Sequence, residues 1–174
     1  MKTHWKTKKN TNLTHCLNYW LFGVKRLGAS LAQSIPKITL SCIQEFDALM
    51  DQDEAKLLNI STRESRIRLI KHHHGEKIFV FGRTIIPQKT YSRYKNCFDS
   101  LGNKSIGDSF LFKKDHINRS EFYVKKCSSD TVKDKLNLIN EIPQQMLWVR
   151  ASIFILDIEH QLLIEEFFMH MPPV

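Results

Sequence analysis

The run KIFVFGRTIIP, residues 77–87, is a long apolar segment with an arginine near its middle. Its β-branched, aromatic and aliphatic residues predict a buried β-strand. Because side chains alternate between the two faces of a strand, Arg83 shares a face with Phe79, Phe81 and Ile85. An unpaired guanidinium is costly to bury. Arg83 is therefore expected either to pair with a carboxylate and tie two strands together or to bind an anionic ligand, and the sequence leaves both possibilities open.

The segments around this strand predict hairpins. SRIRLI, residues 65–70, and the run 77–87 flank KHHHGE, so Gly75 is expected at a tight turn. Two further strand-like runs flank DIEH, residues 157–160, near the end of the chain. KITLSCI and SEFYVKKC have strand character as well. Hairpins without βαβ alternation indicate an α+β fold, an antiparallel β-sheet with helices packed around it.

The other segments predict helices and surface structure. We expect one or two helices in residues 13–34, and helix or irregular structure in residues 44–59. Residues 91–112 predict a helix, a turn and a short apolar helix. Residues 128–145 are polar and are expected to form an excursion on the surface. The first twelve residues carry four lysines and predict a flexible basic arm ahead of a single domain, residues 13–174.

Composition bounds the class of protein. The chain has 174 residues, 42% of them hydrophobic and 25% charged, which suits one globular domain. Its net charge of +8 favours anionic partners: nucleic acid, an anionic membrane surface or a small acidic metabolite. The four cysteines are widely spaced and predict packing residues in a reduced compartment. No apolar run approaches the roughly 20 residues of a membrane span, so neither an integral membrane segment nor secretion is expected.

Several common site motifs are absent from the sequence. The run His72–His74 lacks the spacing of zinc ligands and predicts a wet hairpin tip. Neither G-x-S-x-G nor a glycine-rich phosphate loop occurs. We therefore expect no metal and no cofactor.

Charges inside apolar strands are the remaining candidates for chemistry. They are Arg83, Arg150 in LWVRASIF, and the pair Glu165 and Glu166 in LLIEEFFM. The two glutamates point to opposite faces of their strand, and both faces are mostly apolar. One of them is therefore expected in an apolar setting that raises its pKa toward a useful range for acid–base catalysis.

Five motifs in order resemble the chorismate pyruvate-lyases and their relatives encoded in algal plastid genomes. They are GRTIIP, SLGNKSIG with FLF, NRSEFYV, LWVRASIF and LLIEEFFM, within residues 65–169. The resemblance implies a ligand enclosed beneath helical flaps. It also implies that Arg83 binds the product's carboxylate and that Glu166 holds the developing phenol oxygen.

The same resemblance implies further contacts in the binding site. Backbone amides at Leu111 and at Leu31 would complete the carboxylate site, although Ala32 stands where the family has a threonine. Arg150 and Arg119 are candidates for the second carboxylate of chorismate.

The function implied is a cofactor-free elimination that converts chorismate into 4-hydroxybenzoate and pyruvate for quinone biosynthesis. The protein is expected to be a monomer in the chloroplast stroma, encoded by an AT-rich plastid genome, or in a bacterial cytoplasm. An alternative is a non-catalytic module that senses small aromatic acids, because the fold resembles effector domains of bacterial transcription regulators. Nucleic-acid binding through the basic arm is a third possibility, but it rests on charge alone, so no specific nucleic-acid partner is expected.

Overall fold

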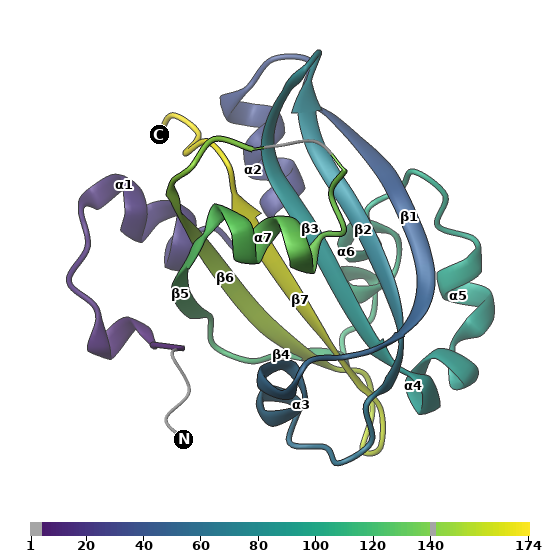
Figure 1. Cartoon of the computed structure of the whole chain (residues 1–174). Coiled ribbons are helices and arrows are strands. Elements are labelled where there is room, and N and C mark those ends of the chain that lie inside the picture. Colours follow the sequence, from purple (N-terminus) through teal and green to yellow (C-terminus); the bar gives the residue numbers. More distant parts are fainter. Residues whose placement is uncertain (1–4, 140–141) are drawn as a thin grey trace.

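The computed structural model describes residues 5–139 and 142–174. Its centre is a seven-stranded antiparallel sheet of order β1-β2-β3-β7-β6-β4, with β5 also paired to β6 (Figure 1). The strands are β1 (Thr39–Leu49), β2 (Glu64–His74), β3 (Lys77–Pro87), β4 (Asn118–Arg119), β5 (Tyr123–Ser128), β6 (Met146–Ile155) and β7 (Gln161–Phe168). The α-helices are α1 (His15–Asn18), α2 (Leu27–Ser34), α3 (Gln52–Leu58), α4 (Gln88–Arg93), α5 (Lys95–Asp99), α6 (Ile106–Ser109) and α7 (Ser129–Lys135). This architecture confirms the predicted α+β class.

Both predicted hairpins are present. β2 and β3 pair along their lengths, and Gly75 takes φ +56° in the turn between them, a conformation that glycine adopts readily. β6 and β7 pair around the DIEH turn, and β3 pairs with β7 in the middle of the sheet. The two hairpins therefore meet strand to strand, so residues near position 83 lie beside residues near position 165.

The segment 44–59 differs from its prediction in its first half. Residues 44–49 continue β1, where Phe46 pairs with Ile67 of β2. Pairing with a neighbouring strand outweighs the weak local signal that allowed a helix here. α3 follows, opened by a capping box between Asp51 and Glu54 and closed by Asn59 in the left-handed conformation.

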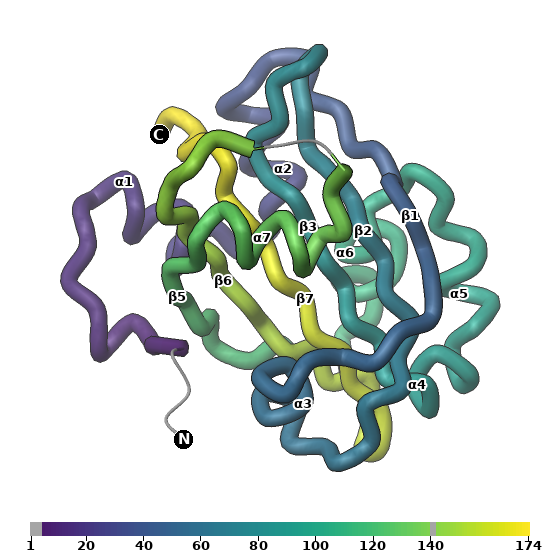
Figure 2. The backbone as a smooth tube through the Cα atoms, in the orientation of Figure 1, coloured from purple at the N-terminus to yellow at the C-terminus, as the bar shows by residue number. Residues whose placement is uncertain are grey.

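The segment 128–145 is also more than a polar excursion. Within it α7 lies across one face of the sheet (Figures 1 and 2). Its Val132 and the following Leu136 are 0% and 1% exposed. Two apolar side chains one helical turn apart give this otherwise polar segment a face that packs on the sheet. Residues 140–141 of the segment lie outside the described residues.

The N-terminal segment packs against the sheet from Trp5 onward. Trp5 is buried, and Lys6 forms an antiparallel bridge with Val124 of β5. The ammonium of Lys125 lies 4.1 Å from the centre of the Trp5 ring. Within the segment expected to be a basic arm, Trp5 and Lys6 thus contact β5, while residues 1–4 lie outside the described residues.

Neighbouring residues of β3 and β7 divide between two faces of the sheet. The core face carries Phe81, Ile85, Leu163 and Phe167 and packs against α3 and α7 in one hydrophobic cluster. The pocket face is the other one. It carries Gly82, Thr84, Ile164 and Glu166 and faces α2 and α6.

Arg83 lies on the core face, within a buried ionic cluster. Its Nε lies 2.9 Å from Oε1 of Glu54 and 3.9 Å from Oε2 of Glu165. The ammonium of Lys135 lies 3.0 Å from Glu54, 2.9 Å from Glu165 and 2.9 Å from Asp51. The arginine in the middle of the strand is therefore paired, and its partners link α3 and α7 to the sheet.

The cluster also determines the charge of its carboxyl groups. Burial opposes ionisation of Glu54, but Lys135 and Arg83 outweigh it and lower the pKa of Glu54 to about 2. Burial raises the pKa of Glu165, which is wholly enclosed. The raised glutamate pKa predicted for this strand thus belongs to Glu165, on the face that lacks the pocket.

We expect Arg83→Met to lower the free energy of unfolding by about 3–5 kcal/mol, because it leaves Glu54 buried without its arginine. Urea denaturation at neutral pH measures this loss. Lys89→Met is the control, since the Lys89–Glu159 pair is exposed, at 66% and 60% of its side chains, and such pairs contribute at most about 1 kcal/mol. Equal losses in both variants would contradict a stabilising role for the cluster.

Candidate active site

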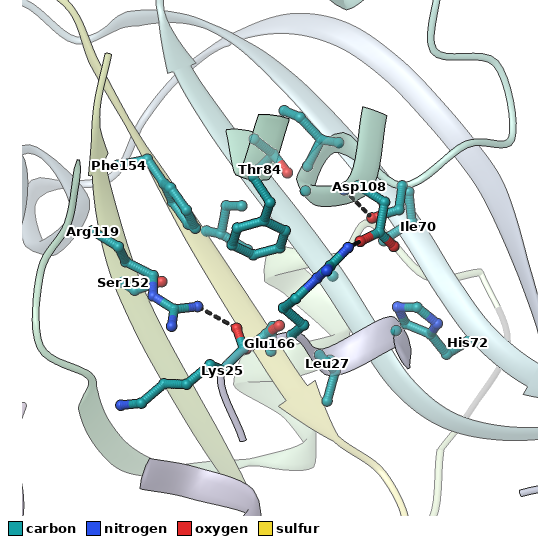
Figure 3. A pocket seen from close by; sticks show the side chains of 18 of the residues that line it. Lys25, Leu27, Ile70, His72, Thr84, Asp108, Arg119, Ser152, Phe154 and Glu166 are labelled. Atoms are coloured by element: carbon teal, nitrogen blue, oxygen red, sulfur yellow. Dashed lines mark hydrogen bonds and ion pairs between the residues drawn. The ribbon is translucent and has the colours of Figure 1, made fainter. Parts of the chain in front are cut away.

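A small cavity lies on the pocket face, between the sheet and two short segments, residues 25–28 and 105–108 (Figure 3). The sheet supplies its floor, which includes Ile70, Gly82 and Ser152. Phenylalanine rings from several elements line it as well: Phe112, Phe122 and Phe154. The cavity volume is ≈ 70 Å³, well below the roughly 300–1,000 Å³ of most ligand pockets. A ring-bearing ligand therefore requires the residues around this cavity to move apart.

Gly82 has no side chain, and this leaves space for the cavity above the sheet. A Cβ atom at this position would lie 2.7 Å from Cγ1 of Ile70 on the adjacent strand. Any side chain at Gly82 would therefore displace Ile70 and occupy the space over the sheet.

Glu166 projects into the cavity and forms an ion pair with Arg150 of the neighbouring strand. Arg150 is 1% exposed, and its Nη1 donates to the carbonyls of Trp20, at 2.7 Å, and Val24, at 2.9 Å. Its guanidinium also lies 4.4 Å from the centre of the Phe122 ring. With its donors engaged in this way, Arg150 holds the Glu166 carboxylate in one orientation.

Arg119 and Lys25 provide positive charge at the same end of the cavity. The Arg119 guanidinium lies 4.6 Å from the centre of the Phe122 ring and donates to the Lys25 carbonyl. Burial lowers the pKa of Arg119, and the nearby cation of Arg150 lowers it further. Burial and then Arg119 lower the pKa of Lys25 in the same way. Cations crowd this end of the site, which favours an anionic ligand.

The second short segment faces the first across the mouth of the cavity. Arg26 precedes α2, Asp108 lies in α6, and the two form an ion pair (Figure 3). A Cβ atom on Gly28 would lie 3.9 Å from Oδ2 of Asp108, so the two segments touch. Counting Arg150 behind Glu166, the site has four cationic side chains, Lys25, Arg26, Arg119 and Arg150, against two carboxylates, Asp108 and Glu166. The excess of two positive charges complements a ligand with two carboxylates.

His72 lines the cavity and is 7% exposed, which differs from the wet hairpin tip expected for the histidine run. The predicted turn is at Gly75, so β2 extends through His72 and directs this side chain to the pocket face. Burial lowers the pKa of His72 to about 4, against the pull of Glu166, and the ring is neutral at pH 7.

The structure brings some of the predicted site residues together and separates others. Glu166 and Arg119 line the cavity, and Arg150 lies directly behind Glu166. Arg83 and Glu166 do not share a site, because Gly82 pairs with Glu166 and Arg83 with Glu165 across β3 and β7. Side chains of paired residues point to the same face, so Arg83 is on the core face.

The two leucines predicted to offer backbone amides lie in hydrophobic clusters. Leu31 is 0% exposed in α2, and Leu111 is 2% exposed in the 3₁₀-helix Leu111–Lys113. Two nearby residues line the cavity instead. They are Leu27, one helical turn before Leu31 in α2, and Phe112, which follows Leu111.

The sequence analysis did not single out four residues of the site, which are Lys25, Arg26, His72 and Asp108. Lys25 and Arg26 precede α2, and Asp108 lies in the four-residue helix α6, segments too short for periodicity to show which side chains face the sheet. The alternation of side chains along β2 could have identified His72. It lies two residues from Ile70 on a strand, and therefore on the same face.

Within residues 5–139 and 142–174, no group of three or more histidine, cysteine, aspartate or glutamate side chains is arranged to hold a metal ion. In the same part of the chain, no helix has the length and apolar character of a membrane span.

Sequence comparison identifies the family. The family model for chorismate lyase matches residues 1–174. A probable chorismate pyruvate-lyase from Coxiella burnetii is 30% identical to this chain, and the match covers 95% of this chain and 85% of the relative. The chain belongs to the chorismate lyase family, as its motifs suggested.

Solved structures share this fold at low sequence identity. The C-terminal domain of PhnF matches with a TM-score of 0.60 at 9% identity, over 82% of this chain and 88% of that domain. The C-terminal domain of the histidine utilization repressor from Pseudomonas syringae matches with a TM-score of 0.56 at 10% identity, over 76% of this chain and 91% of that domain. At such low identity these matches show the fold alone.

We expect the buried His72 to make stability depend on pH. Its folded pKa of about 4 lies below the ordinary value of 6.5, so the unfolded chain binds a proton first as the pH falls. Stability is therefore full above pH 6.5 and falls by about 2 kcal/mol by about pH 5. Urea denaturation across this range should show a flatter profile for His72→Asn. The control is His74→Asn, in the exposed part of the hairpin, and a slope unchanged in both variants would contradict the assignment.

Proposed function

We propose that this protein is a chorismate pyruvate-lyase, which converts chorismate into 4-hydroxybenzoate and pyruvate without a cofactor. The observation that carries the proposal is the charge of the site. Its cations exceed its carboxylates by two, and phenylalanine rings line the same cavity. Chorismate is a dianion with a six-membered ring, so its charge complements the excess of cations, and its ring can pack on the phenylalanine rings once the cavity widens. Membership of the chorismate lyase family supports the same activity.

The reaction breaks the ether bond between the ring and the enolpyruvyl group. The ring loses a proton and becomes aromatic, while the departing enolpyruvate gains a proton and becomes pyruvate. Because aromatisation drives the reaction, the protein needs mainly to orient the ether and to stabilise negative charge on the leaving oxygen.

Glu166 is the proposed acceptor in this step. A carboxylate oriented by Arg150 accepts hydrogen bonds, so Glu166 is suited to take the ring proton or to hold the ring hydroxyl. Arg119 and Lys25, at the same end of the cavity, are the proposed partners for the charge on the departing group. Arg83 has no part in the proposed site, because its buried partners are on the core face.

The test is incubation of the purified protein with chorismate, followed by chromatography of 4-hydroxybenzoate. We expect turnover by the unaltered protein and a loss of about 10²–10⁴-fold in Glu166→Gln, the usual contribution of a positioned acid or base. Thermal unfolding of each variant shows that the loss is not a folding defect.

Glu165→Gln is the matched control for this experiment. It makes the same chemical change one residue away, on the core face, so it is expected to lower stability and to keep turnover at temperatures where the variant is folded. Turnover lost in Glu165→Gln and retained in Glu166→Gln would reject the proposed site.

A second candidate function is the binding of a small aromatic acid without turnover. It is supported by the regulator domains that share the fold, one of which is described as a ligand-binding domain of a putative GntR-family regulator from Bordetella bronchiseptica. That domain matches with a TM-score of 0.52 at 7% identity, over 79% of this chain and 90% of that one. A sensor would be stabilised by 4-hydroxybenzoate, by about 2.7 kcal/mol at a hundred times the Kd, and would release no pyruvate from chorismate.

A further inference from the structure

The mouth of the cavity is closed by one exchangeable ion pair. Arg26 and Asp108 come from the two short segments that meet over the site, and their side chains are 56% and 44% exposed. Exposed pairs of this kind contribute little to stability. Opening this contact therefore costs little, although the contact covers a cavity too small for a substituted ring.

The other cations of the site are more firmly engaged. Arg150 bonds two backbone carbonyls as well as Glu166, and Arg119 bonds the Lys25 carbonyl among aromatic rings. Lys25 donates to the Phe22 carbonyl and lies over the Phe122 ring, 5.3 Å from its centre. Among the described residues, Asp108 is the single hydrogen-bond partner found for the Arg26 guanidinium.

Arg26 also lies where a ring-bearing acid would need a cation. Its guanidinium is 5.3 Å from the centre of the Phe112 ring, which lines the cavity. A planar guanidinium can bind a carboxylate through two parallel hydrogen bonds and stack on a ring at the same time. Arg26 is thus equipped to hold the carboxylate of an aromatic acid that enters beside Phe112.

We propose that Arg26 binds the ligand's carboxylate and that Asp108 occupies Arg26 until the ligand displaces it. This inference rests on the proposed ligand class, a ring that carries a carboxylate. The incoming acid exchanges one carboxylate for another on the same guanidinium, so the site opens without leaving Arg26 unpaired. A neutral ring of the same shape must break the Arg26–Asp108 pair and receives no charged contact in return, so Arg26 determines selectivity for acids.

The test is a double-mutant cycle on ligand binding, measured by titration calorimetry with 4-hydroxybenzoate and its neutral amide, 4-hydroxybenzamide. Asp108→Asn should tighten binding of both ligands about two- to five-fold, because neither ligand then has to break the pair. Arg26→Gln should weaken binding of the acid by about 10- to 100-fold, and it should tighten binding of the amide about two- to five-fold, because the pair is absent from this variant as well. In the Arg26→Gln background, Asp108→Asn should have no effect.

Asp99→Asn is the matched control. The Lys95–Asp99 pair has almost the same exposure, 58% and 42%, and lies in α5, outside the cavity lining. This variant should bind both ligands as the unaltered protein does. Two results would overturn the inference even if the protein turns over chorismate. One is an affinity of Asp108→Asn for the acid that is unchanged or weaker, and the other is an affinity of Arg26→Gln for the acid equal to that of the unaltered protein.

Hydrogen exchange without ligand separates the two possible failures. If Asp108 holds the two segments together, Asp108→Asn speeds exchange in residues 25–28 and 105–108, while Asp99→Asn does not. In one outcome, Asp108→Asn exchanges faster even though the protein binds neither ligand and does not consume chorismate. That result would support the Arg26–Asp108 contact and reject the proposed ligand class. Unchanged exchange together with unchanged affinities would reject the contact itself.

Discussion

The alternation of side chains along β3 and β7 is the constraint on which the rest of this structure depends. The two strands pair so that Gly82 meets Glu166 and Arg83 meets Glu165. Glu165 and Arg83 therefore lie on the core face, where Lys135 pairs with Glu165 and Glu54 pairs with Arg83. The other glutamate is left on the opposite face, above a glycine. One register thus separates a cluster that stabilises the fold from a cavity suited to bind a ligand.

The cavity in turn depends on segments from both ends of the chain. Glu166 is held by Arg150, and Arg150 is held by carbonyls of the N-terminal segment. The segment around residues 19–24, which includes the π-helix Tyr19–Gly23, thus has two roles. It buries Trp20 and Leu21, which are 0% exposed, in a cluster with α2, and its carbonyls provide the acceptors for a buried guanidinium. A π-turn is a common feature near functional sites, and here it lies directly behind the proposed acceptor.

Much of this arrangement was predictable from sequence, and the limits have physical causes. Strong period-two patterns identified both hairpins and the antiparallel class, because long buried strands leave a clear signal. The same patterns placed Arg83 with Phe79, Phe81 and Ile85. Phe79 belongs instead to the cluster around Trp20, because the pairing of β2 and β3 shifts register between Val80 and Ile78. The patterns carried no information on which face the cavity would use. Residues 128–145 looked like surface because the two side chains that α7 buries, Val132 and Leu136, are a small part of a polar segment. Arg26 and Asp108 are 82 residues apart in sequence, so only the tertiary structure brings them together.

The bonds from Arg150 to the carbonyls of Trp20 and Val24 span 130 and 126 residues. Such contacts form late, because the chain must first close a very long loop. During synthesis the N-terminal segment leaves the ribosome long before β6 and β7 exist, and it has no guanidinium to bind in that interval. Its apolar residues share a cluster with Phe79 and Val80 of β3, which are made earlier, but its carbonyls cannot bind Arg150 until β6 has been made. The bonds that orient Glu166 therefore become available only when both ends of the chain are present.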